Sequence, residues 1–139
     1  MPDEMIAVVD DDAFVRKGLS RLLGAYSYRV QTYAGGQEFI DSLNAQVPQC
    51  LILDLNMEPM NGGEVLHYLT DTGNRIPTII LTGDDSPENR ERCQRAGAVA
   101  FMIKPAEAEK LVKTIQTVLD RRPLGDNPPK SVGFSSPHI

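Results

Sequence analysis

The stretch MIAVVDDD, residues 5–12, is an unbroken apolar run that ends abruptly in three acidic residues. Short continuous apolar runs are typical of β-strands that are buried on both faces, as in a parallel sheet covered by helices. Two further stretches repeat the pattern: CLILDL at residues 50–55 contains Asp54, and TIIL at residues 78–81 is followed by Thr82 and Gly83. These three runs predict the central strands of a sheet whose strands end on polar residues.

Helical patterns and turn signals fill the intervals between these strands. Apolar residues recur at helical spacing in residues 15–23, around Phe39 and around Leu66, and Ser86-Pro87 predicts the start of a polar helix over residues 88–95. Residues 29–34 alternate like an edge strand, 99–103 resemble a last strand, and 106–120 a last helix. Five strands alternating with five helices predict an α/β fold: a five-stranded parallel sheet of order 2-1-3-4-5, flavodoxin-like and doubly wound.

Composition excludes several classes of protein. The 139 residues fit one domain, and 41% hydrophobic with 24% charged residues indicates a soluble globular chain. A net charge of −5 argues against a nucleic-acid surface, and no apolar run reaches the roughly 18 residues of a membrane span. We therefore expect a cytoplasmic protein. Cys50 and Cys93 lack metal-site spacing and are interpreted as buried apolar fillers.

A change of composition marks the end of the domain. Residues 1–122 carry the alternating strand and helix patterns, whereas residues 123–139 are rich in proline and glycine, as flexible tails and linkers are. The sequence therefore predicts one domain followed by a C-terminal tail or a truncated linker. It leaves open whether the protein acts alone or is the N-terminal part of a longer regulator.

Polar residues stand at the carboxyl ends of four predicted strands. Asp10, Asp11 and Asp12 follow the first strand, Asp54 ends the third, and Thr82 and Lys104 end the fourth and fifth. In an open parallel sheet, ligands bind beyond these ends, where the strand order reverses. We therefore expect the six side chains to converge on one edge of the sheet.

The chemistry of such a cluster follows from its charge. Two carboxylates about 4 Å apart repel by roughly 4 kcal/mol at an effective dielectric constant near 20, so the fold needs a proton or a cation to hold them together. All-oxygen ligands suit Mg²⁺, or Mn²⁺ in its place, which is commonly shared between carboxylates and a phosphate. Asp54 is then a nucleophile that forms an acyl phosphate, while Lys104 and the Thr82 hydroxyl contact phosphoryl oxygens.

These residues occur in segments that closely resemble the receiver domains of bacterial two-component response regulators. The matching segments are VVDDD at residues 8–12, LILD at 51–54, LTG at 81–83, and AGA with FMIKP at 96–98 and 101–105. The likeness runs from about residue 4 to residue 121. VRK at residues 15–17 and AGA at 96–98 are similar to the subgroup typified by the nitrogen-fixation regulator.

The resemblance implies a set of site residues. Asp10, Asp11, Asp54 and the backbone carbonyl of Asn56 would bind the metal. Thr82 and Phe101 would form the switch, with Phe101 turning inward after phosphorylation. The output face would comprise the helix at 88–95, the strand at 99–103 and the helix at 106–120.

The same resemblance implies partners and a limited chemistry. A sensor histidine kinase or a phosphotransfer protein would supply the phosphoryl group, and a homodimer could form through the output face. The chain would not be an enzyme beyond self-catalysed phosphotransfer and autodephosphorylation.

Two departures from the family pattern and one backbone feature complete these predictions. The loop after the acceptor reads MEPMNG at residues 57–62, so that proline is displaced by one place and Glu58 adds a charge near the metal site. Ala106 stands where the nitrogen-fixation subgroup often has phenylalanine. The resemblance also predicts a cis peptide between Lys104 and Pro105.

Two rival interpretations remain. In phosphatases of the haloacid dehalogenase type, an Asp-x-Asp motif follows an apolar strand, so Asp10 would be the nucleophile and Asp12 the acid/base. That family has threonine or valine where this chain has Phe14. The other rival is a degenerate receiver that serves as an interaction module without phosphorylation, although every acceptor-site residue is present.

Overall fold

The computed structural model describes residues 4–120, which form one sheet with helices on both sides. The strand order is β2-β1-β3-β4-β5, and every neighbouring pair is parallel, as the sequence predicts. The strands are β1 (Met5–Val9), β2 (Arg29–Tyr33), β3 (Cys50–Leu53), β4 (Thr78–Thr82) and β5 (Ala100–Ile103); the helices are α1 (Ala13–Ala25), α2 (Gly36–Ser42), α3 (Gly62–Asp71), α4 (Pro87–Arg95) and α5 (Ala108–Asp120). The predicted tail, residues 123–139, lies outside the described residues.

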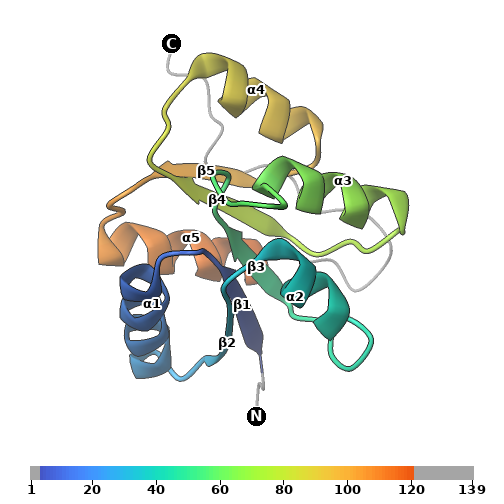
Figure 1. Cartoon of the computed structure of the whole chain (residues 1–139). Helices are drawn as coiled ribbons and strands as arrows, with labels where there is room; N and C mark the ends of the chain where they lie inside the picture. The colour runs from blue at the N-terminus through green and yellow to red at the C-terminus, as the bar shows by residue number, and fades with distance from the viewer. Residues whose placement is uncertain (1–3, 121–139) are drawn as a thin grey trace.

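The sheet separates two apolar layers (Figure 1). Helices α2, α3 and α4 cover one face, and α1 and α5 cover the other. Successive residues of a strand enter opposite layers: Val9 packs beneath the first group of helices and Val8 beneath the second. Burial on both faces is the reason why the central strands are continuous apolar runs.

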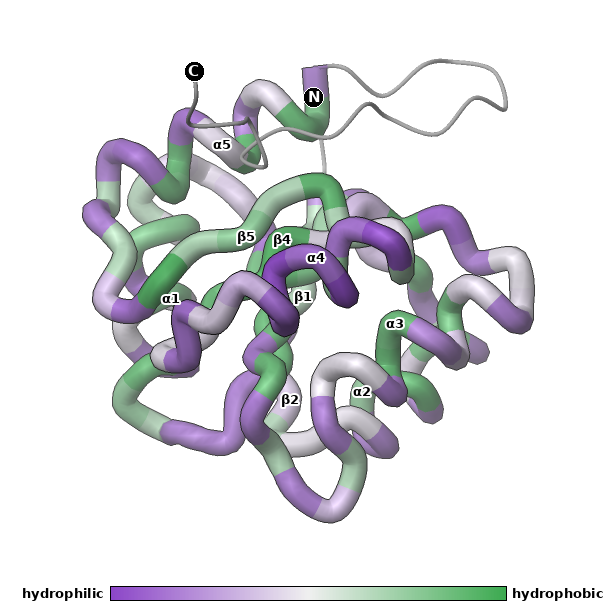
Figure 2. The backbone as a smooth tube through the Cα atoms, turned by 90° about the horizontal axis from the view of Figure 1, so that it is seen from above, coloured by the Kyte–Doolittle hydropathy of each residue, from purple (hydrophilic) through white to green (hydrophobic). Residues whose placement is uncertain are grey.

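Helix α4 is strongly polar and, like α1, buries a single residue. Cys93 is the only residue of α4 that is buried, whereas α5 buries Leu111, Val112, Ile115 and Val118. Figure 2 shows α4 as an almost continuously hydrophilic segment. The prediction of a polar helix after Ser86 is confirmed, and the Ser86 hydroxyl caps it by accepting from the backbone of Asn89 at 3.0 Å. Within residues 4–120, no helix has the length and apolar character needed to cross a membrane.

Some predicted boundaries are wrong by one or two residues. Strand β5 begins at Ala100 rather than residue 99, and β3 ends at Leu53, so that Asp54 stands just beyond the strand. Helix α5 begins at Ala108 instead of Ala106, because Pro105 ends the preceding turn and the carbonyl of Glu107 accepts the first helical hydrogen bond, from Leu111. Ala106 is only partly buried and packs against the layer beneath α5.

Candidate functional site

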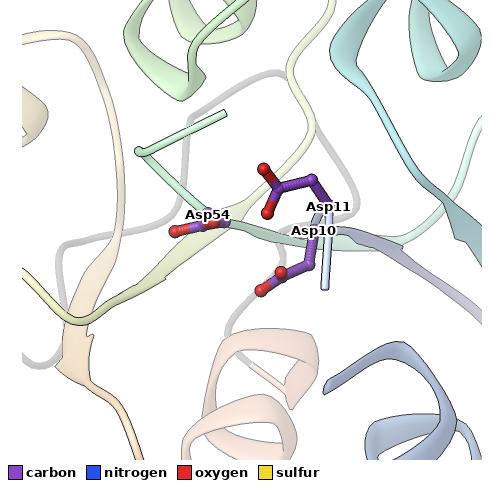
Figure 3. A group of neighbouring side chains, drawn as sticks. All are labelled: Asp10, Asp11 and Asp54. Carbon is purple, nitrogen blue, oxygen red and sulfur yellow. The ribbon is translucent and has the colours of Figure 1, made fainter. Parts of the chain in front are cut away.

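An acidic cluster lies where β1 and β3 end side by side. Asp10 and Asp54 each follow the last residue of their strand, and Val9 and Leu53 are paired in register. The backbone N–H of Asp54 donates to the carbonyl of Val9 at 3.0 Å, which holds the two strand ends together. Figure 3 shows the carboxylates of Asp10, Asp11 and Asp54 extending toward the same side. The predicted convergence of these three residues is confirmed. The prediction is wrong for Asp12, whose side chain instead caps α1 by accepting from the N–H of Phe14 at 2.9 Å.

Lys104 joins this cluster from the end of β5. Its Nζ lies 2.7 Å from Asp10 Oδ2 and 3.5 Å from Asp54 Oδ2, and both carboxylates are almost fully buried. One ammonium group therefore balances part of the charge of two carboxylates that have little water around them. The Lys104–Pro105 peptide is cis, as predicted.

Burial and neighbouring charge shift the pKa values of this pair. Burial raises the pKa of Asp54, and the charge of Asp10 raises it further, while Lys104 offsets part of the effect. Burial alone would lower the pKa of Lys104, but the hydrogen bond to Asp10 and the charge of Asp54 outweigh it, so the pKa is raised. Lys104 thus remains a cation at neutral pH, whereas burial and the charge of Asp10 destabilise the ionised form of Asp54.

Thr82 is fully buried at the end of β4 and is held by two donors. Its Oγ1 accepts from the side-chain Nδ2 of Asn56 at 3.4 Å and from the backbone N–H of Asp84 at 3.3 Å. Asn56 also donates its backbone N–H to Asp54 Oδ1 at 3.3 Å, so one residue contacts both the acidic cluster and Thr82. The structure therefore places Thr82 next to the cluster through Asn56.

Phe101 lies in β5 with its ring already buried beneath α4. The exposed fraction of this residue is 4%, so the ring already lies inward in this arrangement, and its movement after phosphorylation stays a prediction. The guanidinium of Arg90, on α4, lies 4.6 Å from the centre of the ring. A movement of Phe101 would therefore require Arg90 or α4 to move as well.

The loop from Asp54 to α3 folds back against the acceptor. The N–H of Gly62 donates to the carbonyl of Leu55 at 3.0 Å, and a Cβ on Gly62 would lie 2.4 Å from the carbonyl oxygen of Asp54. Only glycine fits such a close approach. The displaced proline forms a second cis peptide, between Glu58 and Pro59, which the sequence did not predict.

Sequence reasoning gave no role to two cationic residues that the structure brings to the site. Arg16 donates Nη1 to the backbone carbonyl of Asp10 at 2.8 Å, and Arg90 covers Phe101. In the sequence, Arg16 is singled out only as part of the VRK motif at residues 15–17, and Arg90 is not singled out at all. Neither contact could be predicted, because neither follows from local spacing.

The donor set fits a hard divalent cation. Ligand oxygens of Asp10, Asp11 and Asp54 lie within 4.8 Å of one another. Asp11 is exposed, and the turn at Asn56 keeps that residue's backbone beside Asp54. Carboxylates with a carbonyl are the ligands that Mg²⁺ prefers. Asp10 already engages Lys104 through Oδ2 and the N–H of Asp12 through Oδ1, so its carboxylate is oriented before any ion binds.

Comparisons with known proteins identify related chains. Residues 6–116 match the family model of the response regulator receiver domain. The response regulator MprA of Mycobacterium ulcerans is 35% identical over 122 residues, covering 88% of this chain and 53% of that protein. The chain thus spans about half the length of the curated relatives it matches.

Solved structures agree with the fold. The chemotaxis protein CheY4 of Vibrio cholerae matches with a TM-score of 0.77 and 29% identity, covering 83% of this chain and 98% of that one. The crystal structure of FixJ-N matches with a TM-score of 0.77 and 31% identity, covering 84% and 93%. Residues 4–120 are similar to both structures in the order of strands and helices.

Proposed function

The chain belongs to the response regulator receiver domain family, and on that premise we propose that Asp54 accepts a phosphoryl group from a sensor histidine kinase or a phosphotransfer protein. The observation that carries the proposal is the convergence of three carboxylates, Lys104 and Thr82 at one edge of the sheet. A structural salt bridge alone would not need the third, exposed carboxylate of Asp11.

The proposed reaction is a transfer between two nucleophiles. A carboxylate oxygen of Asp54 attacks the phosphorus, the bond from phosphorus to the histidine nitrogen of the donor breaks, and the imidazole leaves with a proton from solvent. The product is an acyl phosphate. Bound Mg²⁺ would neutralise charge that develops on the phosphoryl oxygens.

The remaining residues would orient and stabilise that group. Asp10, Asp11, Asp54 and the carbonyl of Asn56 would hold the ion. Lys104 is near enough to Asp54 to shift from a carboxylate oxygen to a phosphoryl oxygen. The chain would need no catalytic activity beyond its own phosphorylation and dephosphorylation.

The signal would leave through α4, β5 and α5. Thr82 and Phe101 lie at this side of the sheet, and α4 buries only Cys93, whereas α5 buries four residues. A partner protein, or a second copy of this chain in a homodimer, would recognise the changed face. We place this activity in the cytoplasm.

A second candidate is a receiver that works with a further output domain. The relatives are about twice as long as the matched segment, which supports a role at the N-terminal end of a longer regulator. A closer relation to the nitrogen-fixation subgroup also remains a proposal, supported by the likeness to FixJ-N.

The proposed function predicts phosphorylation that depends on Asp54 and on Mg²⁺. Incubation with radiolabelled acetyl phosphate and Mg²⁺ should label the wild-type chain on an aspartate, and Asp54→Asn or EDTA should abolish the label. Asp41→Asn, at an exposed position on α2, is the matched control and should be labelled normally. Full labelling of Asp54→Asn would exclude Asp54 as the acceptor, and labelling of Asp10 would support the phosphatase-like alternative.

A further inference from the structure

Phe101 and α4 are joined by one contact that nothing in the family motifs specifies. The Arg90 guanidinium lies over the Phe101 ring, 4.6 Å from its centre, and closes the outer side of a ring that is otherwise buried. The Arg90 side chain retains 38% of its exposure, so the pair lies at the boundary between core and solvent. A cation over an aromatic face is attracted by the ring's electron density.

The same guanidinium is also held by the loop that precedes α4. Its Nη2 lies 3.2 Å from Asp85 Oδ1. Asp85 adjoins Asp84, whose backbone N–H donates to the Thr82 hydroxyl. The two predicted switch residues are therefore connected through the start of α4: Thr82 contacts Asp84, Asp85 contacts Arg90, and Arg90 contacts Phe101.

We propose that Arg90 is a positioning residue of the switch, which holds Phe101 and α4 in the arrangement where Thr82 is bonded to Asn56 and Asp84. This inference rests on the proposed function. If the Thr82 hydroxyl moves toward a phosphoryl group on Asp54, its bond from Asp84 is lost and the loop that carries Asp85 is released. Arg90 then loses its anchor, and Phe101 loses its cover.

The strength of these contacts suits a switch. A partly exposed cation–π contact and an exposed ion pair are each weak, and α4 buries only Cys93 besides. A ligand can move such an equilibrium by its differential affinity for the two arrangements. Removal of Arg90 should therefore shift the equilibrium toward the phosphorylated arrangement by roughly three- to fivefold.

The test measures binding of beryllofluoride, a phosphoryl mimic, in the presence of Mg²⁺. Arg90→Met keeps a long side chain over the ring and removes the cation, and it should bind beryllofluoride roughly three- to fivefold more tightly than wild type. Arg95→Met is the matched control, because it removes the same charge from an exposed pair with Glu91 on the same helix. Its affinity should equal that of wild type. Asp85→Asn, which keeps the cation but weakens its anchor, should have an intermediate effect.

A second measurement tests the contact between Arg90 and Phe101 directly, in the absence of beryllofluoride. In Arg90→Met, the NMR signals of the Phe101 ring should move, and amide exchange in α4 should be faster than in Arg95→Met. Unchanged or weaker binding of beryllofluoride by Arg90→Met, with normal binding by wild type, would overturn the role of Arg90 alone. Failure of wild type to bind beryllofluoride at all would instead remove the proposed function, and this inference with it.

Discussion

At Lys104, one ammonium group stabilises two buried carboxylates. Asp10 and Asp54 face each other at the edge of the sheet, and Lys104 Nζ lies within 3.5 Å of an oxygen of each. When one partner of a buried ion pair is removed, the other is left uncompensated, which costs more than the pair itself contributes. The contribution of Lys104 to stability is therefore greatest when no divalent cation is bound.

We predict that Lys104→Met lowers the free energy of unfolding by about 1–3 kcal/mol in EDTA, less than for a fully buried pair because the side chain is partly exposed. Urea denaturation measures this change. Adding Asp54→Asn to Lys104→Met should restore part of the loss, since one of the two buried carboxylates is then neutral and only Asp10 is left without its cation. Lys113→Met, at an exposed position on α5, should leave stability unchanged. A double variant no more stable than Lys104→Met would contradict this account of charge balance.

The raised pKa of Asp54 predicts a pH dependence of stability in EDTA. The folded state holds the Asp54 proton more tightly than the unfolded state, whose aspartates titrate near 3.9. Below about pH 4 both states are protonated, and Asp54 carries no penalty. As pH rises through the raised pKa of the folded state, the free energy of unfolding falls, by about 1.4 kcal/mol for each tenfold difference in proton affinity.

Asp54→Asn should remove that dependence. Its free energy of unfolding in EDTA should equal that of wild type near pH 3.5 and exceed it at pH 7.5, as measured by urea denaturation across this range. Asp41→Asn should not show the same pH-dependent gain. Parallel curves for wild type and Asp54→Asn would show that the burial of Asp54 has no cost.

The element that shapes the acceptor is the loop between β3 and α3. Asn61 and Glu64 form a reciprocal capping box, each side chain accepting from the other residue's N–H at 2.9 Å. This cap fixes where α3 begins, and Gly62 at its first position touches the backbone of Asp54. The position of α3 is therefore tied to that of the acceptor.

We predict opposite effects for two glycine-to-alanine substitutions. Gly62→Ala should lower the free energy of unfolding by about 1–3 kcal/mol, because its Cβ meets backbone that cannot move aside cheaply. Gly18→Ala, in open space inside α1, should raise it by about 0.5–1 kcal/mol. Urea denaturation of both variants is the measurement, and a neutral Gly62→Ala would mean that the loop can shift away from Asp54.

At the scale of the whole molecule, both apolar layers and the acidic cluster lie within residues 4–120. The family match ends at residue 116. Folding stability and cation binding should therefore belong to the domain assigned to residues 1–122, independently of residues 123–139.

We predict that a chain ending at residue 122 unfolds with the same free energy as the full chain and gains the same stability from Mg²⁺. A ligand that binds only the folded state stabilises it by about 2.7 kcal/mol at one hundred times its dissociation constant. Thermal unfolding of both chains with Mg²⁺ and with EDTA tests this, and Asp54→Asn should respond more weakly to Mg²⁺. A shortened chain that is less stable by more than about 1 kcal/mol would assign a structural role to residues 123–139.

Local pattern determined the architecture and the identity of the main site residues. Apolar runs buried on both faces leave little choice but a parallel sheet, and the right-handed crossover rule then brings Asp10, Asp54, Thr82 and Lys104 to one edge. Because these side chains sit at strand ends, knowledge of strand order was enough to predict that they converge. The polar character of α4 was also visible in its composition.

Only the tertiary structure decided how those residues are connected. The bond from Arg16 to the Asp10 carbonyl, the two bonds held by Thr82, and the position of Arg90 over Phe101 depend on loop paths and side-chain directions. The cis peptide at Glu58–Pro59 likewise has no signal in local spacing. The spacing of apolar residues and the order of strands specify the path of the backbone to within a few ångströms. A hydrogen bond or a cation–π contact instead requires that atoms from distant segments be placed to within a fraction of an ångström. This precise placement of side-chain atoms is set by the packing of the whole core.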